Sequence, residues 1–149
     1  MKVSPTTDEL PFLVLAAANA LVESIQSAMA HAGYTDLRPA HGFAFVRLAG
    51  AGCTVGQLAD HLGITKQAAS KLVDELARQD YVARSPHPDD GRAVLLVLSD
   101  KGRAATRAAS QAATDAVTVW ASALEPGRIE QISHDLSLLA GNSGVRPTW

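Results

Sequence analysis

Residues 54–76 decide the fold, and they read TVGQLADHLGITKQAASKLVDEL. Thr54 and Thr65 stand where helix N-caps belong, because a threonine hydroxyl accepts a hydrogen bond from the backbone at the start of a helix. Gly63 supplies the turn between the two predicted helices. In the second helix the apolar residues share one face, which packs on the first helix: Ala69, Leu72, Val73 and Leu76. This spacing predicts a helix-turn-helix.

The opposite face of the second helix is polar near its N-terminus, where the side chains are Lys66, Gln67, Ser70 and Lys71. The major groove of B-DNA admits one helix, usually led by its N-terminal end. Glutamine can hydrogen-bond adenine, lysine can reach guanine or a phosphate, and a hydroxyl serves either target. Free backbone N–H groups at Thr54 and Thr65 are further candidates for phosphate contacts. The pattern predicts a DNA-binding surface.

A β-hairpin is predicted after the helix-turn-helix, with strands at 81–84 and 93–98 and an Asp-Gly turn in the loop between them. Arg92 near the tip is a candidate for minor-groove contact, and Arg84 on the first strand is a second basic candidate. The residues leave an alternative open, in which Asp89 or Asp90 pairs with one of these arginines.

The helix-turn-helix, the hairpin segments YVAR at 81–84 and PDDGR at 88–92, and the run LVLSDKG at 96–102 together resemble the MarR family of winged helix-turn-helix transcriptional regulators. The match covers about residues 35–103, and the flanking helices fit that family's arrangement. The resemblance implies a mainly α fold with a small β-hairpin wing. It also implies a homodimer in which the N- and C-terminal helices of two copies interlock.

The resemblance implies a function as well: binding of a palindromic DNA operator, usually as a repressor and less often as an activator. Carried over residue by residue, the major-groove contacts fall on Lys66, Gln67, Ser70 and Lys71. The minor-groove contact falls on Arg92, since Gly91 stands where many members have the first of two adjacent arginines. A small aromatic or phenolic effector is a further implied partner, and its cleft would be lined by His31, Tyr34 and His41.

The expected organisation is one domain over 1–149. Its DNA-binding lobe would span 36–103, and the dimerisation helices would span 8–35 and 104–141. The first of these helices is apolar nearly all round, so it must be covered on more than one side, by a second copy in a chain this short. Its charge-free stretch at 10–22 is too short to span a bilayer, and we expect it to be buried.

Composition narrows the function classes. The 149 residues hold 13 Lys and Arg against 15 Asp and Glu, a net charge of −2, and only the segment 65–103 is positive, with seven basic and six acidic residues. Cys53 stands alone, which excludes a disulfide framework and a cysteine-based zinc site, and we expect a silent, partly buried thiol. The histidines have no metal-ligand spacing, and no catalytic motif or cofactor site appears.

We expect a cytoplasmic regulator, not an enzyme. The alternative function is that of a winged helix used only for protein contacts.

Overall fold

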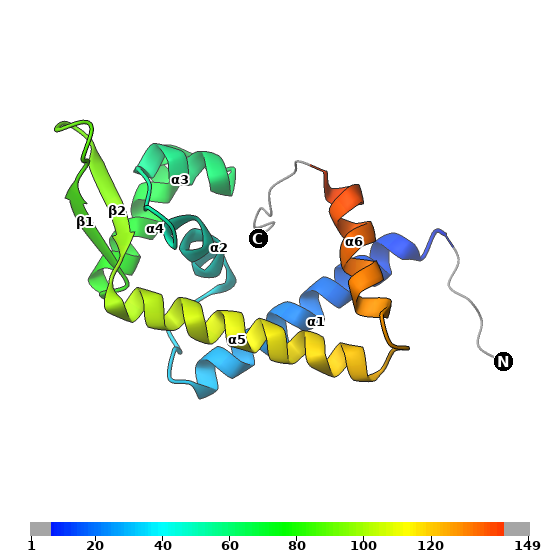
Figure 1. Ribbon diagram of the computed structural model, residues 1–149. Helices are drawn as coiled ribbons and strands as arrows, with labels where there is room; N and C mark the ends of the chain where they lie inside the picture. The colour runs from blue at the N-terminus through cyan, green and yellow to red at the C-terminus, as the bar shows by residue number, and fades with distance from the viewer. Residues whose placement is uncertain (1–6, 142–149) are drawn as a thin grey trace.

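The computed structural model describes residues 7–141, which form an elongated chain of six helices and one antiparallel hairpin (Figure 1). In chain order the elements are α1 (Leu10–His31), α2 (Pro39–Leu48), α3 (Val55–Leu62), α4 (Lys66–Arg78), β1 (Val82–Pro86), β2 (Val94–Leu98), α5 (Asp100–Ser122) and α6 (Arg128–Ala140). The predicted fold class, mainly α with a hairpin wing, is confirmed.

Side-chain caps fix the starts of three helices. The hydroxyl of Thr54 accepts from the backbone N–H of Gln57 at 3.2 Å, and that of Thr65 accepts from Ala68 at 3.1 Å. Ser99 does the same for α5. Because each cap satisfies an N–H that has no partner within its helix, α3, α4 and α5 begin where the sequence predicts.

The core lies in one lobe, between α2, α3, α4, the hairpin and the first turns of α5. Its largest wholly buried side chains include Leu58 and Leu62 of α3, Leu76 of α4 and Leu96 of β2. Burial of each such side chain contributes roughly 1.5–3 kcal/mol. The predicted packing of α4 on α3 is therefore the centre of the lobe.

The hairpin is built in the register Val82↔Leu98 to Pro86↔Val94. β1 continues to Pro86, so the loop is shorter than the predicted one. The turn closes with the backbone N–H of Ala93 donating to the carbonyl of Asp90 at 3.0 Å. Cys53 forms an isolated bridge with Leu96 on the other side of β2, which ties the hairpin to the segment before α3.

α1 and α6 bury few of their side chains within the single chain. Met29 is the one buried residue of α1, and α6 has none. Phe12 is 74% exposed and Leu139 is 81% exposed, because a single copy of the chain offers these helices little cover besides α5 (Figure 1). The expectation of a buried helix over 10–22 is thus wrong for the isolated chain.

By length and composition alone α1 could cross a membrane, since its mean hydropathy reaches 1.4; within 7–141 it is the one helix that passes this test. The feature is weak evidence for a membrane span, because helices of soluble proteins pass the same test. α1 also lies along α5 and carries Glu23 at its surface.

The first turn of α5 makes a close backbone contact that only glycine allows. A Cβ on Gly102 would lie 2.2 Å from the carbonyl oxygen of Tyr81. We expect Gly102→Ala to lower the free energy of unfolding by about 1–3 kcal/mol, because either α5 or the strand end must shift. Urea unfolding followed by circular dichroism measures this.

Gly42→Ala is the matched control, because Gly42 is also helical and nothing lies within 4 Å of the position that a Cβ would take there. This variant should keep or slightly raise stability, since alanine is the better helix former by about 1 kcal/mol. Equal losses in the two variants would contradict the close-contact explanation.

Candidate functional site

The amino end of α4 projects from the lobe as the sequence predicts. Lys66, Gln67 and Lys71 are exposed and Ser70 is half-buried, while Ala69 between them is wholly buried against the core. Because the apolar face of α4 packs against the core, its polar face points toward solvent. This arrangement presents two ammonium groups, an amide and a hydroxyl within the first two turns of one helix.

The two capping threonines differ in what their backbones can still offer. The N–H of Thr54 already donates to Oε1 of Gln57 at 3.0 Å, which completes a capping box. The expectation of a free N–H at Thr54 is therefore wrong, because the glutamine three residues later takes that donor. Thr65 is exposed at the amino end of α4, where its hydroxyl caps the helix by accepting a hydrogen bond from the backbone N–H of Ala68.

The hairpin tip presents Arg92 to solvent. Asp90 accepts from the backbone N–H of Arg92 at 3.0 Å, and the N–H of Asp89 donates to Nδ1 of His87. Among residues 7–141 the Arg92 guanidinium has no carboxylate partner. The acidic residues of the loop therefore shape the turn and leave this guanidinium available.

Arg84 is placed differently from Arg92. Its guanidinium forms an ion pair with Asp74 of α4. The sequence leaves Asp89 and Asp90 open as its partners, but strand β1 runs beside α4 and brings Asp74 closer. Arg84 thus joins the wing to α4, and any contact with DNA would have to share or break this pair.

The next residue of α4, Glu75, holds a second arginine on the other side of the helix. Nη2 of Arg38, the residue that precedes α2, lies 2.5 Å from Oε2 of Glu75. Two neighbouring carboxylates of α4 therefore connect this helix to both the wing and the start of α2. No periodicity in the sequence signals the Arg38–Glu75 pair, which joins residues 37 positions apart.

His41 lies wholly buried beside this pair. Its Nδ1 accepts from the backbone N–H of Arg38 at 3.0 Å, and its Nε2 is 3.6 Å from Oε2 of Glu75. Burial lowers the pKa of His41, and the charge of Glu75 opposes that shift in part. A neutral imidazole fits these contacts, with Nδ1 as acceptor and the remaining N–H directed at the carboxylate.

A cavity of about 470 Å³ opens between α1, α2 and α5. Its lining is mostly apolar, with Val22 and Ile25 of α1, Phe43 and Val46 of α2, and Ala109 of α5 among the residues that form it. A volume of this size is within the range of small-molecule sites. It lies where the lobe meets the long helices.

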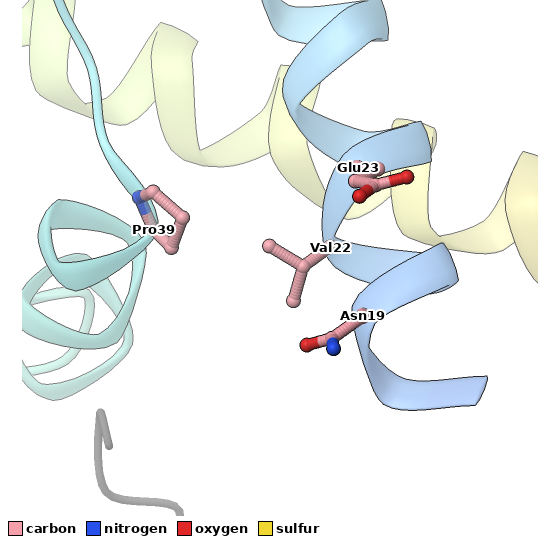
Figure 2. Close-up of a pocket in the computed structure, with 4 residues that line it drawn as sticks. All are labelled: Asn19, Val22, Glu23 and Pro39. Carbon is pink, nitrogen blue, oxygen red and sulfur yellow. The ribbon is translucent and has the colours of Figure 1, made fainter. Parts of the chain in front are cut away.

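A smaller hollow of about 230 Å³ adjoins this cavity and shares Val22 and Pro39 with it. Figure 2 shows Val22 extending from α1 toward Pro39 at the start of α2, with Asn19 one turn earlier and Glu23 beside it. The hollow therefore adds an amide and a carboxylate at one edge of an otherwise apolar space.

None of the three residues predicted to line an effector cleft lines this cavity. His31 is exposed, and its Nδ1 lies 2.7 Å from the carbonyl of Ser27. Tyr34 is half-buried with its ring 6.4 Å from that of Tyr81, and His41 points into the lobe. The cavity that the structure shows is lined by other side chains than the three that the resemblance implied.

The Cys53 thiol is 1% exposed, and burial raises its pKa. A buried thiol with a raised pKa is a poor nucleophile, which agrees with the predicted silent role. Among residues 7–141 no group of three His, Cys, Asp or Glu side chains is placed to hold a metal ion.

Most of the lobe matches the model of one protein family. The model of the MarR family matches residues 35–93. No curated protein sequence matches the chain. Among solved structures, RV1404 from Mycobacterium tuberculosis is similar with a TM-score of 0.77 and 20% identity, over 99% of this chain and 100% of that one.

Two further solved structures cover nearly the whole chain. A MarR-family transcriptional regulator from Rhodococcus sp. RHA1 has a TM-score of 0.72 at 20% identity, over 96% of this chain and 100% of its own. CouR from Rhodococcus jostii RHA1, solved with p-coumaroyl-CoA bound, has the same TM-score and identity over 97% and 100%. The predicted resemblance is confirmed at the level of family pattern and fold.

The buried His41 should make stability depend on pH. Because its pKa in the folded chain lies below the ordinary value of 6.5, the unfolded chain binds the proton more readily. The free energy of unfolding should therefore be highest above that value and fall as the pH drops through it. Urea unfolding at several pH values between about 7.5 and about 5 measures this.

His41→Gln should flatten this dependence, whereas His31→Gln, a change at an exposed position, should leave it in place. Three charged groups act on His41: Glu75 and Asp36 favour its protonation, and Arg38 opposes it. An unchanged slope in His41→Gln would show that other groups cause the acid loss.

Proposed function

We propose that this chain is a transcriptional regulator of the MarR family and that two copies of it bind a palindromic DNA operator. The match of residues 35–93 to the family model and the shared winged-helix fold support this proposal. The observation that carries this proposal is the exposed polar amino end of α4. It offers Lys66, Gln67, Ser70 and Lys71 to a major groove, and the wing offers Arg92 to the adjacent minor groove.

The exposed apolar surface of α1 and α6 supports the homodimer. Phe12, Leu15, Leu138 and Leu139 are all more than 60% exposed. Surfaces of this kind on a soluble chain mark a protein interface. The proposed division gives 36–103 to DNA binding and 8–35 with 104–141 to dimerisation, although α5 already begins inside the lobe.

The cavity between α1, α2 and α5 supports regulation by a small effector. It lies between the lobe and the helices that would form the dimer, so a ligand there would bear on the separation of the two α4 helices. Half-sites on DNA lie about 34–36 Å apart, and a change of a few ångströms prevents both lobes from docking together. We propose a repressor that such an effector releases, acting in the cytoplasm and without catalytic activity.

Lys66→Ala and Lys71→Ala test the DNA contacts. If each lysine neutralises one phosphate, each substitution should lower the slope of log affinity against log salt by about one. Fluorescence anisotropy with a fragment of the upstream region of the protein's own gene, at several salt concentrations, measures the slope. Arg107→Ala removes an exposed charge from α5 and should leave the slope unchanged.

Should both lysine variants keep the wild-type slope and affinity, α4 does not contact the phosphates. A wild-type chain that binds no DNA at any salt concentration would favour the alternative, in which the winged helix serves protein contacts only.

Charged substitutions on the apolar surface test the dimer. Phe12→Lys combined with Leu139→Lys should convert a dimer to monomers, because each lysine would be buried without a partner at the interface. Light scattering after size exclusion measures the mass. Val94→Lys, at an exposed apolar position on the wing, should leave the dimer intact. A wild-type monomer would refute the proposed assembly.

A further inference from the structure

Arg38 takes part in two features of the structure, a cavity and an ion pair. It lines the cavity between α1, α2 and α5, and its guanidinium is paired with Glu75 of α4 at 2.5 Å. The Arg38 side chain is 63% exposed and that of Glu75 is 31% exposed. This one residue therefore connects the proposed effector cavity to the helix that carries the proposed DNA contacts.

The chemistry of the cavity indicates what it would bind. Among the lining residues within 7–141, Arg38 is the single charged side chain, and the other polar ones are Gln26, Thr106 and Ser110. An apolar body fits the walls. The guanidinium of Arg38, if it turned from Glu75 toward the cavity, would match an anionic group, because arginine fits a carboxylate in both charge and geometry.

We propose that Arg38 is an exchange residue: an apolar carboxylate in the cavity takes the Arg38 guanidinium from Glu75 and thereby frees α4 from α2. The inference rests on the proposed function, since it describes how the effector acts. Glu75 accepts from Nη2 of Arg38, and the ligand carboxylate needs the same side chain turned toward the cavity. The two carboxylates therefore compete for one cation.

Loss of the pair alters the restraints on α4 unequally. Asp74 still holds Arg84 of the wing, so the wing side of α4 stays tied. On the other side, the partner that remains to Glu75 within the described part of the chain is the imidazole of His41, at 3.6 Å. The helix is then restrained by the wing and by its core face, and is free to tilt relative to α2.

The exchange predicts an unusual effect of Glu75→Gln: this substitution on α4 should tighten ligand binding in the cavity. The probes are cinnamate and its uncharged analogue cinnamamide, titrated into the full-length protein by calorimetry. Glu75→Gln should bind cinnamate about two- to fivefold more tightly than the wild type, which is the range of a partly exposed ion pair. Arg38→Gln should lose the preference for cinnamate over cinnamamide, about tenfold.

Asp74→Asn is the matched control, because Asp74 is the neighbouring ion-paired carboxylate of α4 but its partner Arg84 does not line the cavity. Its affinity for cinnamate should equal that of the wild type. Glu75→Asp retains the charge with a shorter reach, so it should give an intermediate affinity and serves if Glu75→Gln fails to fold.

Three results would overturn the exchange: no cinnamate binding to the wild type, equal binding of cinnamate and cinnamamide, or no gain in Glu75→Gln and Glu75→Asp. The last result would mean that Arg38 bridges both carboxylates. These titrations need no DNA, so they decide the exchange even if the protein proves not to bind an operator. Conversely, operator binding that cinnamate weakens in the wild type but not in Arg38→Gln would support both proposals together.

Discussion

The burial of one face of α4 against α3 is the constraint on which the rest depends. Ala69, Val73 and Leu76 are wholly buried on one face of the helix. Because of this spacing, the opposite face points toward solvent. The polar residues at the amino end are thus positioned by packing elsewhere on the same helix. A two-residue shift of the apolar pattern, about 200° around the helix, would turn Gln67 and Lys71 toward the core and remove the surface that the proposed function needs.

Ion pairs add a second level of control to this helix. Asp74 and Glu75 are adjacent in sequence and lie on different sides of α4, where they hold an arginine from the wing and an arginine from the start of α2. Partly exposed pairs of this kind contribute little to stability, about 1 kcal/mol or less each. Because these ion pairs contribute so little free energy, they can break and re-form with another partner. The apolar contacts of the core contribute much more and would be too costly to rearrange.

Local signals predicted the elements well, and long-range contacts escaped prediction. The threonine caps and Gly63 set the starts and the turn of the helix-turn-helix, because each acts within four residues of its own position. The cavity needs α1, α2 and α5 together, and the Arg38–Glu75 pair depends on how α2 sits against α4, so no single segment encodes either. The exposure of α1 in the single chain has a related cause: an apolar stretch predicts burial, but the second copy expected to cover it is another molecule.

The unbroken length of α5 has a mechanical consequence. This helix runs for 23 residues from the cap at Ser99, beside the wing, to Ser122, close to α6, without a proline or a glycine after its first turn. At 1.5 Å per residue it is a lever about 34 Å long. A tilt of about 5° at one end displaces the other by about 3 Å, so a modest rearrangement near the cavity is carried as a rigid-body movement from one end of the molecule to the other.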